Sequence, residues 1–268
     1  MTDATLQLTH LRLERRGDGV AVLTLDNAGQ RNAMSDEMTE SWVRAVDHLA
    51  GDRSVRAVVV TGEGSAFSSG GNLDWLASEP DAGVDALRER MLPFYRAWLS
   101  IRRLEVPTIA AINGPAIGAG LCMALACDLR FAAENAKMGV PFLKLGLHPG
   151  MAGTFLLPEV VGLAAARDLF LTGRIVEASE ALSMGLVSRV IASGAFLDEA
   201  VAAATQIAAN APIATRLTKL ALLDGGHATF DSALQWEALA QPVTLATDDL
   251  QEGIRAVQEK RAPRFGGS

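Results

Sequence analysis

The sequence predicts an α/β fold in which a parallel sheet is followed by a C-terminal all-helical region. Short β-rich runs alternate with helical patterns up to Ile191, and two of those runs end in glycine-rich turns that lead into helices. Such alternation is typical of βαβ units. After Ile191 the periodic segments indicate helices with no strand between them. We therefore expect a core over residues 1–191 and a helical region over residues 192–268.

A hairpin and a helix open the predicted core. Residues Leu6–Glu14 and Val20–Leu25 alternate like paired strands, and the two glycines of segment 16–19 favour a turn between them. Ser35, followed by two acidic residues, is a good N-cap for a helix that ends near Ala50. The chain should therefore start with an antiparallel pair before the parallel strands begin.

The rest of the core repeats the order of strand, glycine-rich turn, helix and strand. The expected elements are a strand Val55–Thr61, a long helix from about Asp85 to Leu104, a strand Thr108–Ile112, a helix Leu121–Cys127 and a strand Leu129–Ala132. In a sheet of this kind the carboxyl ends of the strands face the ligand.

Four helices are expected at the C-terminal end, over residues 197–210, 212–223, 230–247 and 248–260. Apolar faces on consecutive helices must be covered. Two arrangements satisfy this requirement. The helices can fold onto their own core, or they can pack between subunits.

Composition excludes several classes of protein. The chain has 268 residues and a net charge of −7, and no run of basic residues is longer than two, which argues against a nucleic-acid surface and favours a small-molecule partner. Two cysteines cannot form a disulfide framework, which suits a reducing compartment. Residues 1–4 do not open a secretory signal, and no apolar run reaches the roughly 18 to 20 residues of a membrane span. We expect a cytoplasmic protein without a membrane partner.

Familiar active-site motifs are missing from the sequence. It contains no complete dinucleotide-binding glycine pattern, no phosphate-binding loop with lysine and no serine-hydrolase elbow. Its histidines and cysteines have no zinc spacing, so we predict no metal site.

Two glycine-rich turns carry the strongest functional signal. Gly62 to Leu73 contains Gly70-Gly71, and Ile112 to Gly120 contains Gly118-Ala119-Gly120. Each follows a β-rich run and leads into a helix. Two such turns can aim bare backbone N–H groups at one point, which stabilises a negatively charged oxygen without a charged side chain.

These turns and several further motifs resemble the crotonase superfamily, the enoyl-CoA hydratase and isomerase group of acyl-CoA enzymes. The resemblance continues, in the family's order, through Leu25-Asp26-Asn27, Asn32-Ala33-Met34, Ala126 to Arg130, Lys144 to Leu147, Pro149 to Thr154, Leu171-Thr172-Gly173, Ala181 to Val187, Thr247-Asp248-Asp249 and Glu252-Gly253. It implies a ββα spiral core, an acyl-CoA thioester as substrate, and self-association as a homotrimer or a dimer of trimers. It implies no permanently bound cofactor, because coenzyme A arrives as part of the substrate.

The resemblance also assigns site residues. Its two oxyanion donors, which stabilise enolate charge on the thioester oxygen, fall on the backbone N–H groups of Gly71 and Ala119. Residues implied in substrate binding are Gln30 and Arg31 beside the nucleotide half, Ser69 beside the adenine, and Gly70, Asn72, Leu73, Gly118 and Phe142. Arg31 could pair with a phosphate or simply be solvated, and both readings stay open. Walls of the acyl pocket are expected at Trp75, 91–98, Phe142 and Met151.

One departure from the family concerns its two catalytic glutamates. Matched by spacing, their positions hold Cys122 and Phe142. A phenyl ring exchanges no proton, and a thiol in an apolar helix is mostly neutral. Ordinary hydratase turnover is therefore not expected.

Three side chains could replace the missing carboxylates. Cys122 is either a thiolate nucleophile or a buried packing residue. His148 is either a general base or a loop histidine bonded to backbone. Asp74 is either a proton carrier or a helix-capping, solvated carboxylate.

Three functions follow from these alternatives. The first is an enoyl-CoA hydratase or isomerase. The second is a divergent member that catalyses isomerisation, decarboxylation, carbon–carbon cleavage or thioester hydrolysis through the same enolate. The third is a non-catalytic acyl-CoA-binding protein.

Overall fold

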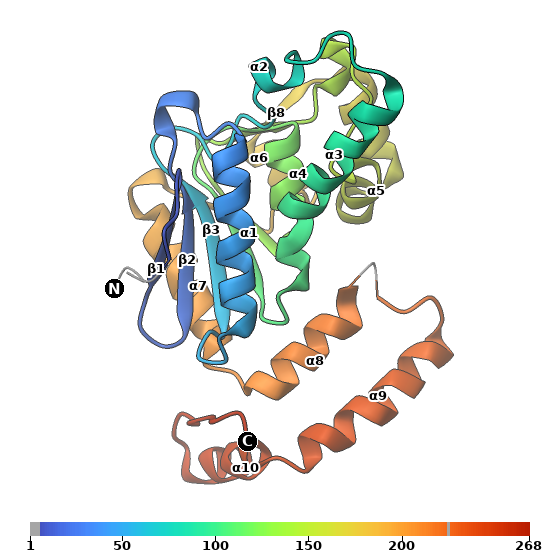
Figure 1. Cartoon of the computed structure of the whole chain (residues 1–268). Helices are drawn as coiled ribbons and strands as arrows, with labels where there is room; N and C mark the ends of the chain where they lie inside the picture. The colour runs from blue at the N-terminus through green and yellow to red at the C-terminus, as the bar shows by residue number, and fades with distance from the viewer. Residues whose placement is uncertain (1–5, 224–225) are drawn as a thin grey trace.

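The computed structural model describes residues 6–223 and 226–268, so residues 1–5, on which the prediction about a secretory signal depends, lie outside it. Its main sheet has six strands in the order β1-β2-β3-β4-β6-β9 (Figure 1). The strands are β1 (Leu11–Arg15), β2 (Val20–Leu25), β3 (Ala57–Gly62), β4 (Thr108–Ile112), β6 (Leu129–Ala133) and β9 (Arg189–Ile191). The pair β1 and β2 is antiparallel and every other neighbouring pair is parallel. The α/β fold class is confirmed.

Strand β3 shows why the central strands are uninterrupted apolar runs. All six of its residues are buried. Val58 and Val60 pack into the larger core, whereas Ala57 and Val59 pack into a second core on the other side of the sheet. Both faces of the sheet are covered, which removes the alternation of polar and apolar residues seen in half-exposed strands.

Helices α1 (Asp36–Gly51) and α3 (Val84–Trp98) cover the first face. The rings of Trp42 and Trp98 stack between them with centroids 5.1 Å apart. Ser35 caps α1 as predicted, because its Oγ accepts a hydrogen bond from the Met38 N–H at 3.3 Å. The predicted long helix is shorter than expected, because a 3-10 helix over Leu99–Arg103 follows α3.

Helix α7 (Phe196–Ala208) covers the second face, opposite α1 (Figure 1). A 3-10 helix over Ser193–Ala195 connects it to β9, which ends at Ile191. Although α7 belongs to the predicted helical region, it packs on the sheet through small residues such as Ala200 and Ala204.

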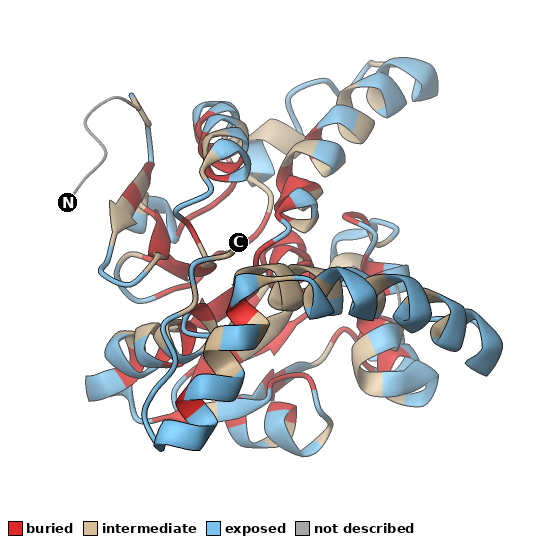
Figure 2. Ribbon diagram, turned by 90° about the horizontal axis from the view of Figure 1, so that it is seen from below, coloured by how far each residue is buried: buried red, intermediate tan, exposed pale blue. Residues whose placement is uncertain are grey.

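The last three helices, α8 (Pro212–Leu222), α9 (Phe230–Leu245) and α10 (Asp248–Glu259), extend away from the sheet (Figure 1). Helix α9 contains no buried residue. Figure 2 shows buried residues gathered in the interior of the molecule and exposed residues on the outer helices. Among the described residues after β9 none lies in a strand, which confirms the C-terminal helical region.

A smaller sheet and the remaining helices complete the fold. The sheet has the order β5-β7-β8, formed by β5 (Ala116–Ile117), β7 (Lys137–Gly139) and β8 (Ile175–Glu177). The helices are α2 (Leu73–Leu76), α4 (Ala119–Leu125), α5 (Gly153–Thr172) and α6 (Ala178–Ser183). None of the helices described is long and apolar enough to cross a membrane.

Candidate active site

A cavity of about 870 Å³ lies beyond the carboxyl ends of β3 and β4. Most of the residues expected at the site line it: Gln30, Arg31, Ser69, Gly71, Asn72, Leu73, Asp74, Gly118, Ala119, Phe142 and His148. The pocket walls expected at Trp75 and Met151 line it too. The fold therefore brings together residues from five separate segments of the chain, at the edge of the sheet where a ligand was expected.

The loop after β3 leaves one backbone donor free. Gly70 has φ +91°, a conformation that favours glycine, and its carbonyl accepts the Met34 N–H at 2.8 Å. The Gly70 N–H donates to the buried Ser68 hydroxyl at 3.2 Å. For Gly71, in contrast, the described residues provide no hydrogen-bond acceptor for the N–H.

The loop after β4 leaves a second donor free. The Gly118 N–H donates to the Gly139 carbonyl at 2.9 Å, and Gly118 has φ 57° and ψ −120°. Ala119 is the first residue of α4, so the acceptor four residues back would be Pro115. That carbonyl already accepts the N–H groups of Phe67 and Ser68, both at 3.1 Å. The Ala119 N–H therefore points out of the start of the helix towards the cavity it lines.

The two loops are in direct contact. A Cβ placed on Gly70 would lie 2.6 Å from the Ile117 carbonyl oxygen and 3.1 Å from the Ala119 nitrogen. Adding the covalent bond lengths, the nitrogens of Gly71 and Ala119 are at most about 7.5 Å apart. The Ile117 N–H also donates to the Ser68 carbonyl at 3.0 Å, which ties the loops together. Two free amides on contacting loops thus border one cavity.

The rim of the cavity near Arg31 is polar. Arg31 has φ 51° and is exposed, and its carbonyl accepts the Ser69 N–H at 2.9 Å. The Ser69 hydroxyl lies 3.5 Å from the Gln30 carbonyl. This hydrogen bonding joins the early loop to the loop after β3, and it leaves the Arg31 guanidinium at the mouth of the cavity.

The segment after Gly71 forms the short helix α2. The Asn72 side chain caps it by accepting the Trp75 N–H at 3.0 Å. Leu73 and Asp74 follow in the first turn and are both exposed. The Asn72 amide is therefore engaged in a cap, whereas the Asp74 carboxylate is open to the cavity and to solvent.

The two positions matched to glutamates differ in placement. Phe142 lines the cavity, and its ring carbons would lie 3.8 Å from a Cβ on Gly118. Cys122 is completely buried behind the wall, with its Sγ 3.8 Å from the Gly150 carbonyl oxygen. Burial raises the pKa of the Cys122 thiol to about 12. Cys122 therefore does not line the cavity, and its burial fits the packing residue rather than the thiolate nucleophile.

His148 lies on the exposed side of the cavity. Its Nδ1 is 2.8 Å from the Pro149 carbonyl oxygen, so this nitrogen carries the proton and donates to backbone. Of the two readings of the sequence, the backbone-bonded loop histidine describes this contact. The contact engages only Nδ1, so the other ring nitrogen has no hydrogen-bond partner among the described residues.

Tyr95 was not assigned a role from the sequence, although it falls in the expected wall segment. Its side chain comes from α3 and lines the same cavity. A helix position inside an apolar pattern gave no signal for a functional hydroxyl group.

Among the described residues, no three His, Cys, Asp or Glu side chains come together as a possible metal site.

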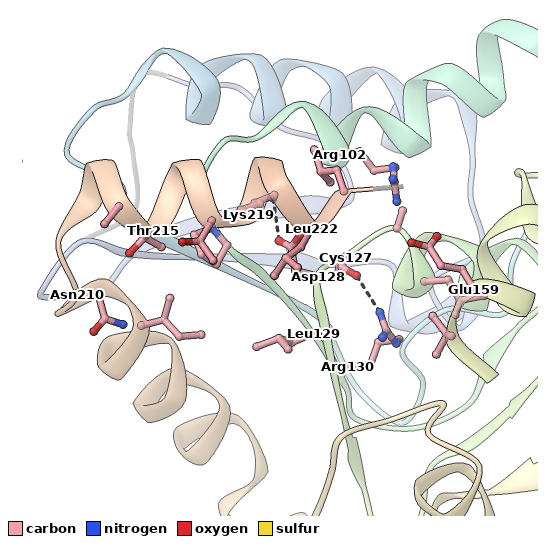
Figure 3. Close-up of a pocket in the computed structure, with 18 of the residues that line it drawn as sticks. Arg102, Cys127, Asp128, Leu129, Arg130, Glu159, Asn210, Thr215, Lys219 and Leu222 are labelled. Atoms are coloured by element: carbon pink, nitrogen blue, oxygen red, sulfur yellow. Dashed lines mark hydrogen bonds and ion pairs between the residues drawn. The ribbon is translucent and has the colours of Figure 1, made fainter. Parts of the chain in front are cut away.

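A second cavity, of about 900 Å³, lies at the opposite ends of the strands, between the sheet and α8 (Figure 3). The Lys219 ammonium lies 2.8 Å from the Asp128 carboxylate and donates to the Val106 carbonyl at 2.8 Å. Asp128 also accepts the N–H of Thr108 at 2.7 Å. Arg130 donates to the Leu186 carbonyl at 2.9 Å. Lys219, Asp128 and Arg130 are therefore all bonded within the protein.

The spiral α/β core and a cavity bordered by two free backbone amides define a crotonase-fold protein. The sequence profile of the enoyl-CoA hydratase/isomerase family matches residues 15–268. The chain belongs to this enoyl-CoA hydratase/isomerase family, as the resemblance in the sequence predicted.

Two sequence relatives and one solved structure agree with this family assignment. A relative from Thermus thermophilus is 42% identical over 246 residues, which cover 92% of this chain and 97% of that protein. The mitochondrial methylglutaconyl-CoA hydratase of Rattus norvegicus is 36% identical over 272 residues, covering 99% of this chain and 84% of its own. The crystal structure of enoyl-CoA hydratase from Bacillus anthracis superposes with a TM-score of 0.91 at 32% identity, covering 97% and 100% of the two chains.

Proposed function

We propose that this protein binds an acyl-CoA thioester and stabilises its enolate through the backbone N–H groups of Gly71 and Ala119. The observation that carries the proposal is that two amides without an acceptor among the described residues lie on contacting loops and border one cavity. Two preorganised donors about 3 Å from a developing oxyanion stabilise it by several kcal/mol. The dipole of α4 adds positive potential at the same point.

The CoA portion would enter over the polar rim. Gln30, Arg31 and Ser69 lie there, with the Arg31 guanidinium free to meet a phosphate group in a charge-assisted hydrogen bond. Asn72, Leu73 and Gly118 would contact the substrate between this rim and the amides, and Phe142 on the acyl side, because all four line the cavity. Gly70, which was also expected at the site, does not line it and would act by positioning Gly71. Coenzyme A would be part of the substrate, and we expect no permanently bound cofactor.

The reaction on the enolate differs from ordinary hydration. If Cys122 and Phe142 stand where the family has its glutamates, no carboxylate activates water at those points. Asp74 and His148 are the titratable side chains of the cavity that we propose as proton carriers, because both line it and both are exposed. A non-catalytic acyl-CoA-binding protein is the second candidate, favoured by the apolar replacement at Phe142.

Gly71→Pro tests the oxyanion proposal, because proline removes the N–H. We expect the variant to lose about a hundredfold in turnover of an acyl-CoA thioester, or a comparable factor in affinity if the protein only binds. Gly83→Pro is the matched control, since Gly83 is exposed and has φ −69°, which proline adopts readily. Unchanged turnover and binding in a folded Gly71→Pro protein would refute the oxyanion assignment.

Hydration of crotonyl-CoA, followed at the enoyl absorbance, separates the candidate reactions. A rate no faster than buffer, together with calorimetric binding of butyryl-CoA, would remove the hydratase and keep the other two. No binding of either thioester would remove all three.

The C-terminal helices support a further part of the proposal, self-association as a homotrimer or a dimer of trimers. Phe230 and Leu239 on α9 are 79% and 73% exposed, and Val257 on α10 is 79% exposed. We propose that residues 192–268 form the oligomerisation region, with α7 also serving its own core. Sedimentation analysis of the protein and of Leu239→Glu tests this: the substitution should shift the assembly towards monomer. We also keep the cytoplasmic location as a prediction.

A further inference from the structure

Tyr95 is the only tyrosine of the chain, and its hydroxyl lies at the inner wall of the candidate active site. The side chain comes from α3, packs edge-on against Phe94 with ring centroids 6.3 Å apart, and is half-buried. A Cβ placed on Gly150 would overlap the Tyr95 Oη and lie 2.8 Å from its Cζ. The phenol therefore occupies the space that any larger residue at position 150 would need.

The Tyr95 hydroxyl is a free hydrogen-bond donor. No described residue accepts a hydrogen bond from it, although it borders a cavity whose other inner residues include Phe94, Phe142 and Met151. Burial, and the proximity of Cys122, raise the pKa of the phenol above its ordinary value. It is therefore neutral at physiological pH and carries its proton. An unpartnered hydroxyl on an apolar wall is satisfied only by water or by a ligand.

The position of this hydroxyl relative to the free amides follows from α4. Cys122 is three residues after Ala119, so the two share a face of the helix about 4.5 Å apart along its axis. The Cys122 thiol contacts the Gly150 carbonyl, and Gly150 contacts the Tyr95 hydroxyl. An acyl group whose carbonyl oxygen meets the Ala119 N–H would extend past this point. The Tyr95 hydroxyl would therefore face the acyl chain beyond the thioester carbon, where the β-carbon is two bonds away and an oxygen on it is three.

We propose that Tyr95 determines specificity by donating a hydrogen bond to an oxygen on the β-carbon of the acyl group, so that the cavity selects β-oxygenated acyl-CoA thioesters over unsubstituted ones. The inference rests on the proposed thioester site and adds the class of acyl group to it. A buried donor discriminates strongly against a ligand that leaves it unpaired.

Calorimetry at neutral pH with acetoacetyl-CoA and butyryl-CoA tests the proposal, because the two ligands differ at the β-carbon. The unaltered protein should bind acetoacetyl-CoA about five- to tenfold more tightly. Tyr95→Phe keeps the ring and removes the donor. It should abolish the preference by weakening acetoacetyl-CoA alone, with the affinity for butyryl-CoA and the melting temperature unchanged.

Two further measurements test the position of the hydroxyl. Gly150→Ala adds a methyl group that would overlap the Tyr95 Oη, so it should displace the hydroxyl and reduce the preference while Tyr95 is still present. Replacement of the single tyrosine by 3-fluorotyrosine gives one fluorine resonance, which acetoacetyl-CoA should shift further than butyryl-CoA.

Equal affinities in the unaltered protein, or a preference that survives in Tyr95→Phe, would overturn the role of Tyr95 and leave the thioester site standing. If neither thioester binds, the proposed function and this inference both fall.

Discussion

Two cavities of this protein have nearly the same volume, but polar groups at one are free to bind a ligand, whereas those at the other are bonded within the protein. The cavity at the carboxyl ends of the strands, about 870 Å³, is bordered by the free amides of Gly71 and Ala119. The cavity at the amino ends, about 900 Å³, contains the ion pair of Lys219 and Asp128, both of which are also bonded to backbone. The volume therefore does not show which cavity binds a ligand, whereas the unsatisfied N–H donors at the carboxyl-end cavity do favour that one.

The difference has a topological origin. At the carboxyl ends, β3 and β4 run into loops that turn into helices, which exposes N–H groups at a helix start. At the amino ends the chain returns from a helix to a strand, and side chains such as Asp128 cap the exposed backbone there. The Asp128 carboxylate, which stabilises the fold, is thus already hydrogen-bonded within the protein. The N–H groups at the carboxyl ends have no such partner among the described residues and can bind a ligand.

Lys219→Met gives the largest expected effect and tests the stabilising role of the amino-end cavity. The Lys219 side chain is 5% exposed, so its removal leaves Asp128 without its cation, and the free energy of unfolding should fall by about 3 kcal/mol. Urea denaturation measures this change, and affinity for acyl-CoA should stay the same.

Lys137→Met is the matched control, because Lys137 and Glu177 form an exposed pair at 4.0 Å that should contribute less than about 0.5 kcal/mol. A loss of acyl-CoA affinity in Lys219→Met would show that the two cavities are not functionally separate.

Gly118→Ala tests the carboxyl-end cavity with a smaller effect. An added Cβ makes only ordinary contact, 3.8 Å from the Phe142 ring, so the strain comes from φ 57° and ψ −120°. Rotation of this residue would redirect the Ala119 N–H, and affinity for an acyl-CoA should fall about tenfold, with about 1–2 kcal/mol lost in stability.

Gly185→Ala provides the comparison from the amino-end cavity, since Gly185 lines it and has φ 77°. It should lose similar stability without losing affinity. Equal losses of affinity in both variants would mean that general destabilisation, rather than the direction of the amide, governs binding.

The smallest expected effect is a fall in the free energy of unfolding at alkaline pH, caused by the two buried thiols, one near each cavity. Cys122 lies behind the carboxyl-end cavity and Cys127 lines the amino-end one; burial raises the pKa of both to about 12. Because the pKa in the folded protein lies above the ordinary thiol value of 9.0, the unfolded chain ionises first. Stability should be complete below pH 9 and fall as the pH rises towards 12, by about 1 kcal/mol for each thiol near pH 10.

Cys122→Ala and Cys127→Ala should each remove half of this alkaline dependence, measured as the slope of unfolding free energy against pH. If the slope of unfolding free energy against pH were unchanged in Cys122→Ala, the thiol would not be neutral in the folded protein. That result would favour the hypothesis that Cys122 is a thiolate nucleophile.

The sequence predicted the architecture well where local signals were strong. The strand Thr108–Ile112 has the predicted bounds, and Ser35 caps its helix as expected. Helix α4 begins at Ala119, two residues earlier than predicted, because glycine-rich segments obscure where a helix starts. Helix α3 ends at Trp98, where a 3-10 segment continues the apolar pattern that suggested a longer helix.

The candidate site was accessible to prediction only in part. The glycine turns are local in sequence, so Gly71 and Ala119 could be named, and the structure places both at the cavity. Whether Cys122 faces the cavity depends on the packing of Gly150 and Gly153 against it, which no local pattern encodes. The Tyr95 hydroxyl depends on the same long-range packing. Contacts of this kind appear only when the distant segments are placed in space.

The use of main-chain amides in the carboxyl-end cavity determines how this protein would respond to random substitution. A Cβ on Gly71 would meet nothing nearer than the Leu76 Cδ1 at 3.7 Å, and position 119 already carries a Cβ. Conservative replacements at the two donors should therefore survive a saturation screen, while Gly70, whose Cβ would lie 2.6 Å from the Ile117 oxygen, should tolerate none. In such a screen the position that tolerates no substitution would be Gly70, next to Gly71, whose N–H is the proposed donor.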